Sequence, residues 1–168
     1  MSFIAVIPAR FGSTRLPGKP LLDIAGQPMI QRVYARAQSS RAERVFVATD
    51  DQRIEDVVKG FGGDCLMTAS DHPTGTDRLA EVADILGLAA DAIIVNVQGD
   101  EPRLPESAIH QVADMLIAHP EASIATLCEP IHGSSDIDDP NQVKVVKSRS
   151  GRALYFSQDR TIHAPACA

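Results

Sequence analysis

Residues 3–19 read Phe3-Ile4-Ala5-Val6-Ile7-Pro8-Ala9-Arg10-Phe11-Gly12-Ser13-Thr14-Arg15-Leu16-Pro17-Gly18-Lys19. The first five are apolar and partly β-branched, which predicts a strand. The loop that follows carries three cations (Arg10, Arg15 and Lys19) and no acid, although the chain has a formal net charge of −6. Backbone N–H groups and fixed cations in such a loop can bind a polyphosphate. The alternative is an ordinary surface turn with solvated charges.

This loop matches neither of the two common phosphate-binding motifs. A Walker A loop needs Ser or Thr after its Gly-Lys pair, but Pro20 follows Lys19 here. The dinucleotide fingerprint needs more closely spaced glycines than Gly12 and Gly18. We therefore expect nucleotide binding of another type, in which side-chain cations neutralise more of the phosphate charge.

Strand-like and helix-like segments alternate along the chain. Strands are predicted at 3–8, 44–49, 64–68, 92–97, 123–128 and 142–147, with a β-hairpin over 143–156. Amphipathic helices are predicted at about 28–39, 51–60, 76–87 and 105–118. This alternation indicates an α/β protein with a mostly parallel sheet in a Rossmann-like three-layer sandwich. We expect one domain over 1–157, followed by a divergent tail over 158–168.

Ligands of such sheets bind beyond the carboxyl ends of the strands, where four loops should meet. Their ranges are 9–19, 49–51, 69–78 and 98–102. In the last of them Gln98 and Asp100 follow the strand predicted at 92–97, which is nearly continuously apolar. Asp100 could hold Mg²⁺ against a triphosphate, because Mg²⁺ takes one or two carboxylates plus phosphate oxygens. Alternatively, Asp100 caps the helix that begins near Pro105.

The third loop ends in Thr74-Gly75-Thr76-Asp77-Arg78. Thr74 is a natural N-cap, and Gly75 permits close approach to a ligand. Arg78 lies in the first turn of the predicted helix, where the helix dipole disfavours a cation, so we consider a phosphate contact. A salt bridge to Glu81 or Asp77 is the alternative. In the second loop, the acids after Thr49 are expected only to cap the next helix.

Composition excludes several other classes of protein. The acidic balance argues against a general nucleic-acid binder, and no apolar run approaches the ~20 residues that cross a bilayer. The N-terminus shows no signal peptide, and the three cysteines have no metal-ligand or disulfide spacing. We therefore expect a cytoplasmic protein with free thiols. Its histidines are expected to be mostly surface or turn residues.

The motifs together resemble the 3-deoxy-manno-octulosonate (Kdo) cytidylyltransferases, the CMP-Kdo synthetases. The resemblance runs from residue 2 to about 157, in the N-terminal two thirds of the family. It rests on Ile7-Pro8-Ala9-Arg10, Ser13-Thr14-Arg15-Leu16-Pro17-Gly18-Lys19, Val47-Ala48-Thr49-Asp50, Gly75-Thr76-Asp77-Arg78-Leu79, Gln98-Gly99-Asp100-Glu101-Pro102 and Pro140-Asn141-Gln142-Val143-Lys144-Val145-Val146. The resemblance implies the nucleotide-diphospho-sugar transferase type of fold.

The resemblance also implies roles for residues that match the family. Arg10, Lys19 and Asp100 would be catalytic, and Asp100 would bind the Mg²⁺ cofactor. The nucleotide would be bound by Ala9, Arg10, Arg15, Lys19, Thr74, Gly75, Arg78 and Gln98. The implied reaction couples CTP to Kdo, giving CMP-Kdo and pyrophosphate for lipopolysaccharide synthesis, in a family expected to form homodimers.

The family continues beyond residue 168, so this chain is expected to be truncated. The missing third would supply most of the Kdo pocket, a second metal-binding aspartate and much of the dimer contact. We expect the fold and the nucleotide half to survive, with exposed apolar surface where that third would pack. Two alternatives remain: another sugar nucleotidylyltransferase, or a non-catalytic nucleotide-binding remnant.

Overall fold

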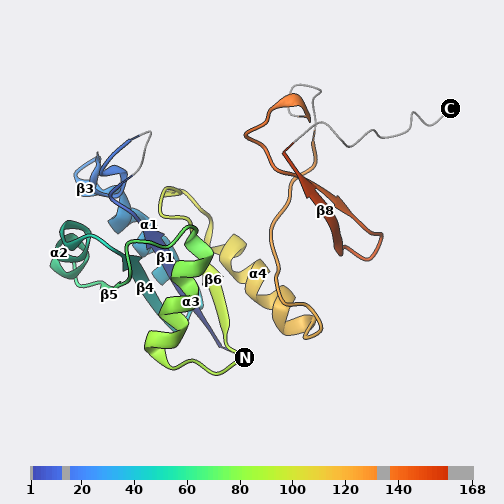
Figure 1. Ribbon diagram of the computed structural model, residues 1–168, viewed down its shortest axis with the longest axis horizontal. Helices are drawn as coiled ribbons and strands as arrows, with labels where there is room; N and C mark the ends of the chain where they lie inside the picture. The colour runs from blue at the N-terminus through green and yellow to red at the C-terminus, as the bar shows by residue number, and fades with distance from the viewer. Residues whose placement is uncertain (1, 13–15, 132–136, 159–168) are drawn as a thin grey trace. The chain divides into compact units, whose positions relative to one another are not determined.

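The computed structural model describes residues 2–12, 16–131 and 137–158 (Figure 1). Contacts along the backbone divide the chain into two compact units, Met1–Ala125 and Thr126–Ala168. The sequence instead predicts a single domain over 1–157. We describe each unit by itself.

A four-stranded parallel sheet lies at the centre of the first unit. Its strands are β1 (Phe3–Ala9), β4 (Arg44–Thr49), β5 (Asp64–Met67) and β6 (Ile93–Asn96), in the order β5-β4-β1-β6. Each matches a predicted strand. In β1 and β4 nearly every residue is buried, as expected for parallel strands covered on both faces. The parallel register, with Ala9 opposite Thr49, brings the carboxyl ends of β1 and β4 to one edge.

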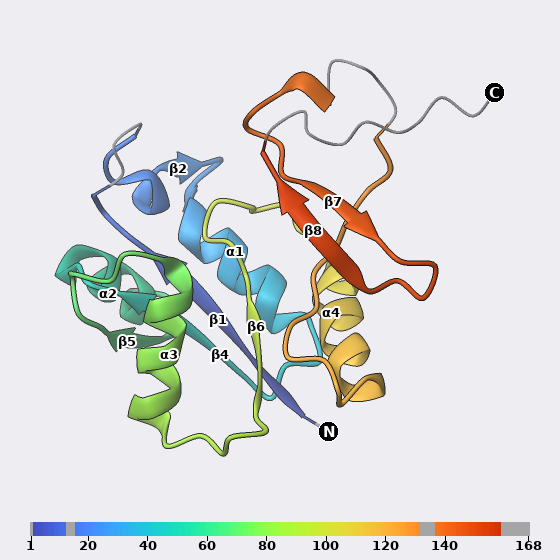
Figure 2. The same ribbon diagram turned by 45° about the vertical axis from the view of Figure 1, so that its right-hand side comes forward.

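Four helices cover the two faces of this sheet. They are α1 (Met29–Gln38), α2 (Gln52–Gly60), α3 (Gly75–Leu86) and α4 (Glu106–Ala118). Apolar residues of α1, α2 and α4 pack with Ala5 and Ile7 of β1, whereas α3 packs on the opposite face with Val6. Figure 2 shows α3 and α1 on opposite sides of the strands. The predicted three-layer α/β sandwich is therefore confirmed.

The largest core residues lie where β1 meets its helices. Ile7 and Ile30 are fully buried on one face, and Val6 and Val82 are fully buried on the other. Each such side chain contributes roughly 1.5–3 kcal/mol through its removal from water. Because both faces of β1 are held in this way, the loop that leaves Ala9 starts from a rigid point.

Two local features differ from the sequence prediction. The strand predicted at 123–128 is wrong: these residues form no strand, and Ile124 is 83% exposed. The segment contains the apolar residues Ile124 and Leu127, but within the described ranges no strand shares a hydrogen-bond ladder with it, and the chain passes from one unit to the other within it. The sequence also missed the short antiparallel pair β2 (Asp23–Ile24) and β3 (Gln27–Pro28).

The described part of the second unit contains the predicted β-hairpin. Its strands are β7 (Lys144–Lys147) and β8 (Ala153–Ser157), paired antiparallel. Lys144 is buried, and its Nζ donates to the main-chain oxygens of Asp139 and Gln158. Exposed apolar side chains are also present here, at Val143, Leu154, Tyr155 and Phe156.

Among the described residues, none of the helices has the length and apolar character needed to cross a membrane. The longest, α4, has 13 residues, whereas a helix that spans a bilayer needs ~20.

Candidate nucleotide site

A pocket of about 500 Å³ opens at the carboxyl edge of the parallel sheet. The loops that follow β1 and β6 supply most of its wall. It is lined by Pro8, Arg10, Leu16, Lys19, Pro20, Met29, Gln98, Gly99 and Asp100. Four of the predicted site residues, from positions far apart in sequence, therefore line one pocket: Arg10, Lys19, Gln98 and Asp100.

Gly99 explains how the two loops come so close. A Cβ atom at this position would lie 2.8 Å from the main-chain oxygen of Pro8, which is closer than a carbon and an oxygen can pack. Only glycine permits this approach of the β6 loop to the end of β1. Its neighbours Gln98 and Asp100 are exposed, whereas Gly99 is buried. The close approach thus leaves both polar side chains accessible at the edge.

Lys19 and Asp100 form an ion pair inside the pocket. The Lys19 Nζ lies 2.7 Å from Oδ2 of Asp100, and the side chains are 38% and 50% exposed. Lys19 begins a short 3-10 helix, η1 (Lys19–Leu21), after Gly18 in the left-handed region at φ 70°. Such solvated pairs contribute little to stability, so either partner can exchange the other for a ligand at small cost.

The alternative role of Asp100, as cap of the following helix, is absent from the structure. The helix α4 begins after Pro105, and no side chain caps it. The carboxylate of Asp100 instead faces the cation of the β1 loop.

Arg10 lies directly after β1 and reaches the loop that follows β5. Its Nη2 donates to the main-chain oxygen of His72 at 2.9 Å. This bond uses one of the five N–H donors of the guanidinium group. The side chain is partly buried, and it lines the pocket beside Lys19. The first and third predicted loops therefore meet at Arg10.

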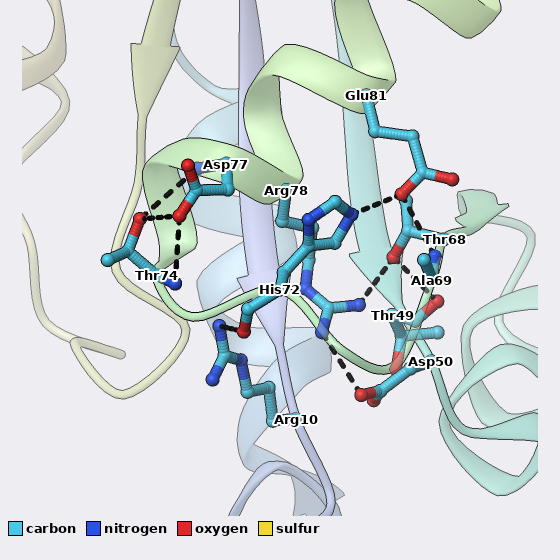
Figure 3. A network of polar contacts seen from close by, with 10 residues as sticks. All are labelled: Arg10, Thr49, Asp50, Thr68, Ala69, His72, Thr74, Asp77, Arg78 and Glu81. Carbon is cyan, nitrogen blue, oxygen red and sulfur yellow. Dashed lines mark hydrogen bonds and ion pairs between the residues drawn. The ribbon is translucent and has the colours of Figure 1, made fainter.

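Arg78 has a different environment from the other predicted cations. Its side chain is fully buried, and it donates to Oδ2 of Asp50 at 3.0 Å and to the hydroxyl of Thr68 (Figure 3). Neither Glu81 nor Asp77, the partners considered from the sequence, forms this ion pair. Its Nε has no hydrogen-bond partner in the described part of the chain. The guanidinium joins the ends of β4 and β5 to α3, and nucleotide contact by Arg78 stays a prediction.

Sequence reasoning missed Asp50 as a partner of the site. The acids after Thr49 were expected only to cap α2, and Asp51 does so by accepting from the N–H of Arg53 at 3.0 Å. The guanidinium of Arg53 holds the pKa of Asp51 below its ordinary value. Asp50 points to Arg78 instead. The unfavourable place of Arg78 against the helix dipole is the available signal that an acid lies opposite it.

Thr74 and Gly75 bring the start of α3 to the same edge. Thr74 accepts from the N–H of Asp77, and the Asp77 carboxylate accepts from the N–H of Thr74, which forms a capping box. The Thr74 hydroxyl also donates to the Asp77 carboxylate, and this bond, followed by that from the Thr74 N–H, lowers the pKa of Asp77. A Cβ on Gly75 would lie 3.7 Å from the ring of Pro8, so the helix begins beside the end of β1.

Ala9 and Arg15 are the two remaining residues of the predicted site. Ala9 is the buried last residue of β1, directly before Arg10. Arg15 lies outside the described residues, together with Ser13 and Thr14.

Asp100 is the candidate metal ligand that the sequence singles out at this edge. Within the described ranges there is no group of three or more His, Cys, Asp or Glu side chains that could hold a metal ion. Asp100 could supply one carboxylate ligand, which suits Mg²⁺ when phosphate oxygens and water complete its shell. Cys65 is a poor candidate for a metal ligand, because burial raises the pKa of its thiol to about 11 and so disfavours the thiolate form that binds metal ions.

The parallel sheet and its polar carboxyl edge define an α/β protein of the nucleotide-binding type. A sequence model described as cytidylyltransferase matches residues 4–165, and the chain belongs to this family. Among its relatives is the 3-deoxy-manno-octulosonate cytidylyltransferase of Hahella chejuensis, which is 63% identical over 94% of this chain. The corresponding protein of Cellvibrio japonicus is 60% identical over the same share.

A solved structure agrees with these relatives. The structure of CMP:2-keto-3-deoxy-manno-octonic acid synthetase in complex with CTP superposes with a TM-score of 0.91 at 44% identity, over 99% of this chain. The resemblance predicted from the motifs is thereby confirmed. The chain spans 62% of the length of the two curated relatives and 68% of the solved chain.

Proposed function

We propose that this chain binds CTP at the carboxyl edge of its sheet and contributes the nucleotide half of a Kdo cytidylyltransferase. The observation that carries the proposal is the pocket in which Arg10, Lys19, Gln98 and Asp100 meet. Support comes from the names of the relatives and from the CTP complex of the superposed structure.

The charges of the pocket suit a triphosphate. Arg10 and Lys19 place two cations beside each other at the end of β1, and the sequence adds Arg15 to the same loop. Transfer of a nucleotidyl group depends mainly on positioning the phosphates and on stabilising the charge that develops on the leaving group. We assign this work to Arg10 and Lys19, with Gln98 between the nucleotide and the sugar.

Asp100 is the residue that would hold Mg²⁺. The ion, when bound, would neutralise charge on the phosphates and on the departing pyrophosphate. In the free pocket the Lys19 and Asp100 charges neutralise each other, and Arg10 leaves a net positive charge. When a nucleotide binds, the Lys19 ammonium exchanges the carboxylate for phosphate oxygens, and Asp100 becomes available as a ligand.

The reaction that fits this site is attack of the anomeric 2-hydroxyl of Kdo on the α-phosphorus of CTP. A new oxygen–phosphorus bond forms, the bond to the β-phosphate breaks, and the hydroxyl proton is released. The products are CMP-Kdo and pyrophosphate. From the family resemblance of the motifs we propose a role in lipopolysaccharide synthesis in the cytoplasm and expect a homodimer.

Release of pyrophosphate tests the proposal directly. The chain is incubated with CTP, Kdo and Mg²⁺, and pyrophosphate is measured beside the variants Lys19→Ala and Asp100→Ala. Any release should depend on both substrates and fall at least about a hundredfold in either variant, the scale of losing one preorganised charged group. Lys59→Ala removes an exposed lysine of α2 that is not part of the pocket lining, and it serves as control.

Two other outcomes select the alternatives. Release with another nucleotide in place of CTP makes the chain a different sugar nucleotidylyltransferase. CTP binding without release, at saturating Kdo and Mg²⁺, makes it a non-catalytic nucleotide-binding protein. Release that survives in both variants contradicts the assignment of the site.

A further inference from the structure

Glu81 of α3 holds the loop that follows β5 at two points. Its Oε2 accepts from the N–H of Ala69 at 2.9 Å and from the imidazole of His72 (Figure 3). The His72 and Glu81 side chains are only 18% and 29% exposed. His72 was expected to be an ordinary surface or turn residue. The structure instead places it between a helix and a loop.

The same loop presents an acceptor to Arg10. The main-chain oxygen of His72 receives the Arg10 Nη2 at 2.9 Å, while the ring of His72 points to Glu81. One residue thus links the carboxylate of α3 to the guanidinium of the nucleotide pocket. Figure 3 shows Arg10 and Glu81 approaching His72 from opposite sides.

The ends of this loop are fixed independently of Glu81. Thr68 donates its N–H and its hydroxyl to the main-chain oxygen of Thr49, and Thr74 is held in the capping box of α3. Between those ends Glu81 binds the loop at Ala69 and at the ring of His72, and Arg10 binds it at the main-chain oxygen of His72. The hydrogen bond from His72, followed by that from Ala69, lowers the pKa of Glu81, which keeps the carboxylate charged.

We propose that Glu81 and His72 are positioning residues, which set the Arg10 guanidinium for the nucleotide phosphates through the main-chain oxygen of His72. The proposal rests on the proposed function for its phosphate ligand. Neither side chain lines the pocket, so their effect on nucleotide affinity passes through Arg10. An arginine held in one orientation loses less freedom when it binds a phosphate.

A double-mutant cycle measures whether the effect passes through Arg10. Affinity for CTP with Mg²⁺ is measured by calorimetry for Glu81→Ala and His72→Ala, each with Arg10 present and in an Arg10→Ala background. We expect each single variant to weaken binding about tenfold, the scale of one hydrogen bond to a charged group. In the Arg10→Ala background we expect less than about a twofold effect.

The matched control is Glu55→Ala. Glu55 is also a helical glutamate that accepts from two side chains, Gln52 and Lys59, but both of these lie on α2 itself. We expect this variant to bind CTP like the wild type. Glu81→Gln keeps an oxygen acceptor for Ala69 and should recover part of the lost affinity. Equal losses in both Arg10 backgrounds, or no loss in either, would overturn the proposal.

A readout without nucleotide separates this inference from the proposed function. The guanidinium ¹⁵N–¹H signals of Arg10 are assigned by their loss in Arg10→Ala. We expect separate Nη signals in the wild type, because the bond to His72 restricts rotation, and averaged signals in Glu81→Ala. A wild type that binds no CTP but shows this change contradicts the proposed function alone. Arg10 signals identical in the two proteins contradict the positioning role.

Discussion

Arg78 shows how a single buried charge can organise a whole edge of the sheet. The guanidinium is fully buried and pairs with Asp50, and it also donates to Thr68. These partners follow different strands, so one side chain joins β4, β5 and α3. A buried charge that loses its partner is costly, because its desolvation is no longer compensated.

Arg78→Ala should therefore destabilise the protein strongly. It leaves Asp50 without its cation and opens a void, so we expect a loss of about 3 kcal/mol in the free energy of unfolding, measured in urea. Arg36→Ala is the control, because Arg36 is an exposed arginine of α1. Its effect should stay within about 0.5 kcal/mol. Equal stability of the two variants would show that the buried pair contributes nothing.

Gly99→Ala tests the close approach of the β1 and β6 loops. The added methyl group would overlap the main-chain oxygen of Pro8, so the strand ends must separate, at a cost of about 1–3 kcal/mol. The control is Gly60→Ala, where a Cβ would meet nothing within 4 Å. At that helical position alanine should be neutral or stabilising by up to about 1 kcal/mol. Thermal unfolding measures the stability of both variants. A Gly99→Ala protein as stable as the wild type would contradict the close approach of the two loops.

Among the helices and strands, α3 contributes most to the site through its N-terminal turns. Its capping box joins Thr74 to Asp77, and its next turns carry Arg78 and Glu81. The sequence predicted the helix and its Thr74 cap correctly, because both follow from local chemistry. It did not predict the partners of Arg78 or Glu81, since these come from loops that only the parallel sheet brings close.

The capping carboxylate predicts how stability depends on pH. The pKa of Asp77 lies below its ordinary value of 3.8 in the folded protein, because Thr74 donates to the charged form. Its contribution is therefore complete above about pH 4 and is lost as pH falls through the lowered folded pKa. The wild type should exceed Asp77→Asn in free energy of unfolding near pH 7, and the gap should narrow toward about pH 2. A gap that is constant or widens in acid would contradict the sign.

Strands were predicted correctly where burial of apolar residues determines them. The prediction failed where strand formation depends on a partner strand. The four strands of the parallel sheet have apolar runs long enough to identify, and each is present. Residues 123–128 also include apolar residues, but no strand in the part of the chain that the structure describes completes their hydrogen bonds. The pair β2–β3 has only two residues in each strand, too few for any periodic signal.

For the whole molecule, the first unit contains the elements that the proposed nucleotide chemistry needs. Its sheet edge brings together Arg10, Lys19, Gln98 and Asp100, all of which the sequence singled out. The four loops predicted to meet there do so through three side-chain bonds, which join Arg10 to His72, Lys19 to Asp100 and Arg78 to Asp50. The two residues of each bond lie 62, 81 and 28 positions apart in sequence, respectively. The sequence did not predict which cations of the site face the pocket and which are buried in the core. That choice depends on neighbours that only the folded chain brings close.

Binding of CTP by this chain is the central claim, and thermal unfolding tests it most directly. The chain is heated with Mg²⁺ and saturating CTP, UTP, GTP or ATP, beside Arg10→Ala and Asp100→Ala. Ligand at 100 times its dissociation constant should add about 2.7 kcal/mol of stability, which is a shift of about 5–11 °C for a protein of this size. We predict this shift for CTP alone and its loss in both variants. A cooperative transition unmoved by CTP, or moved equally by all four nucleotides, would contradict the account.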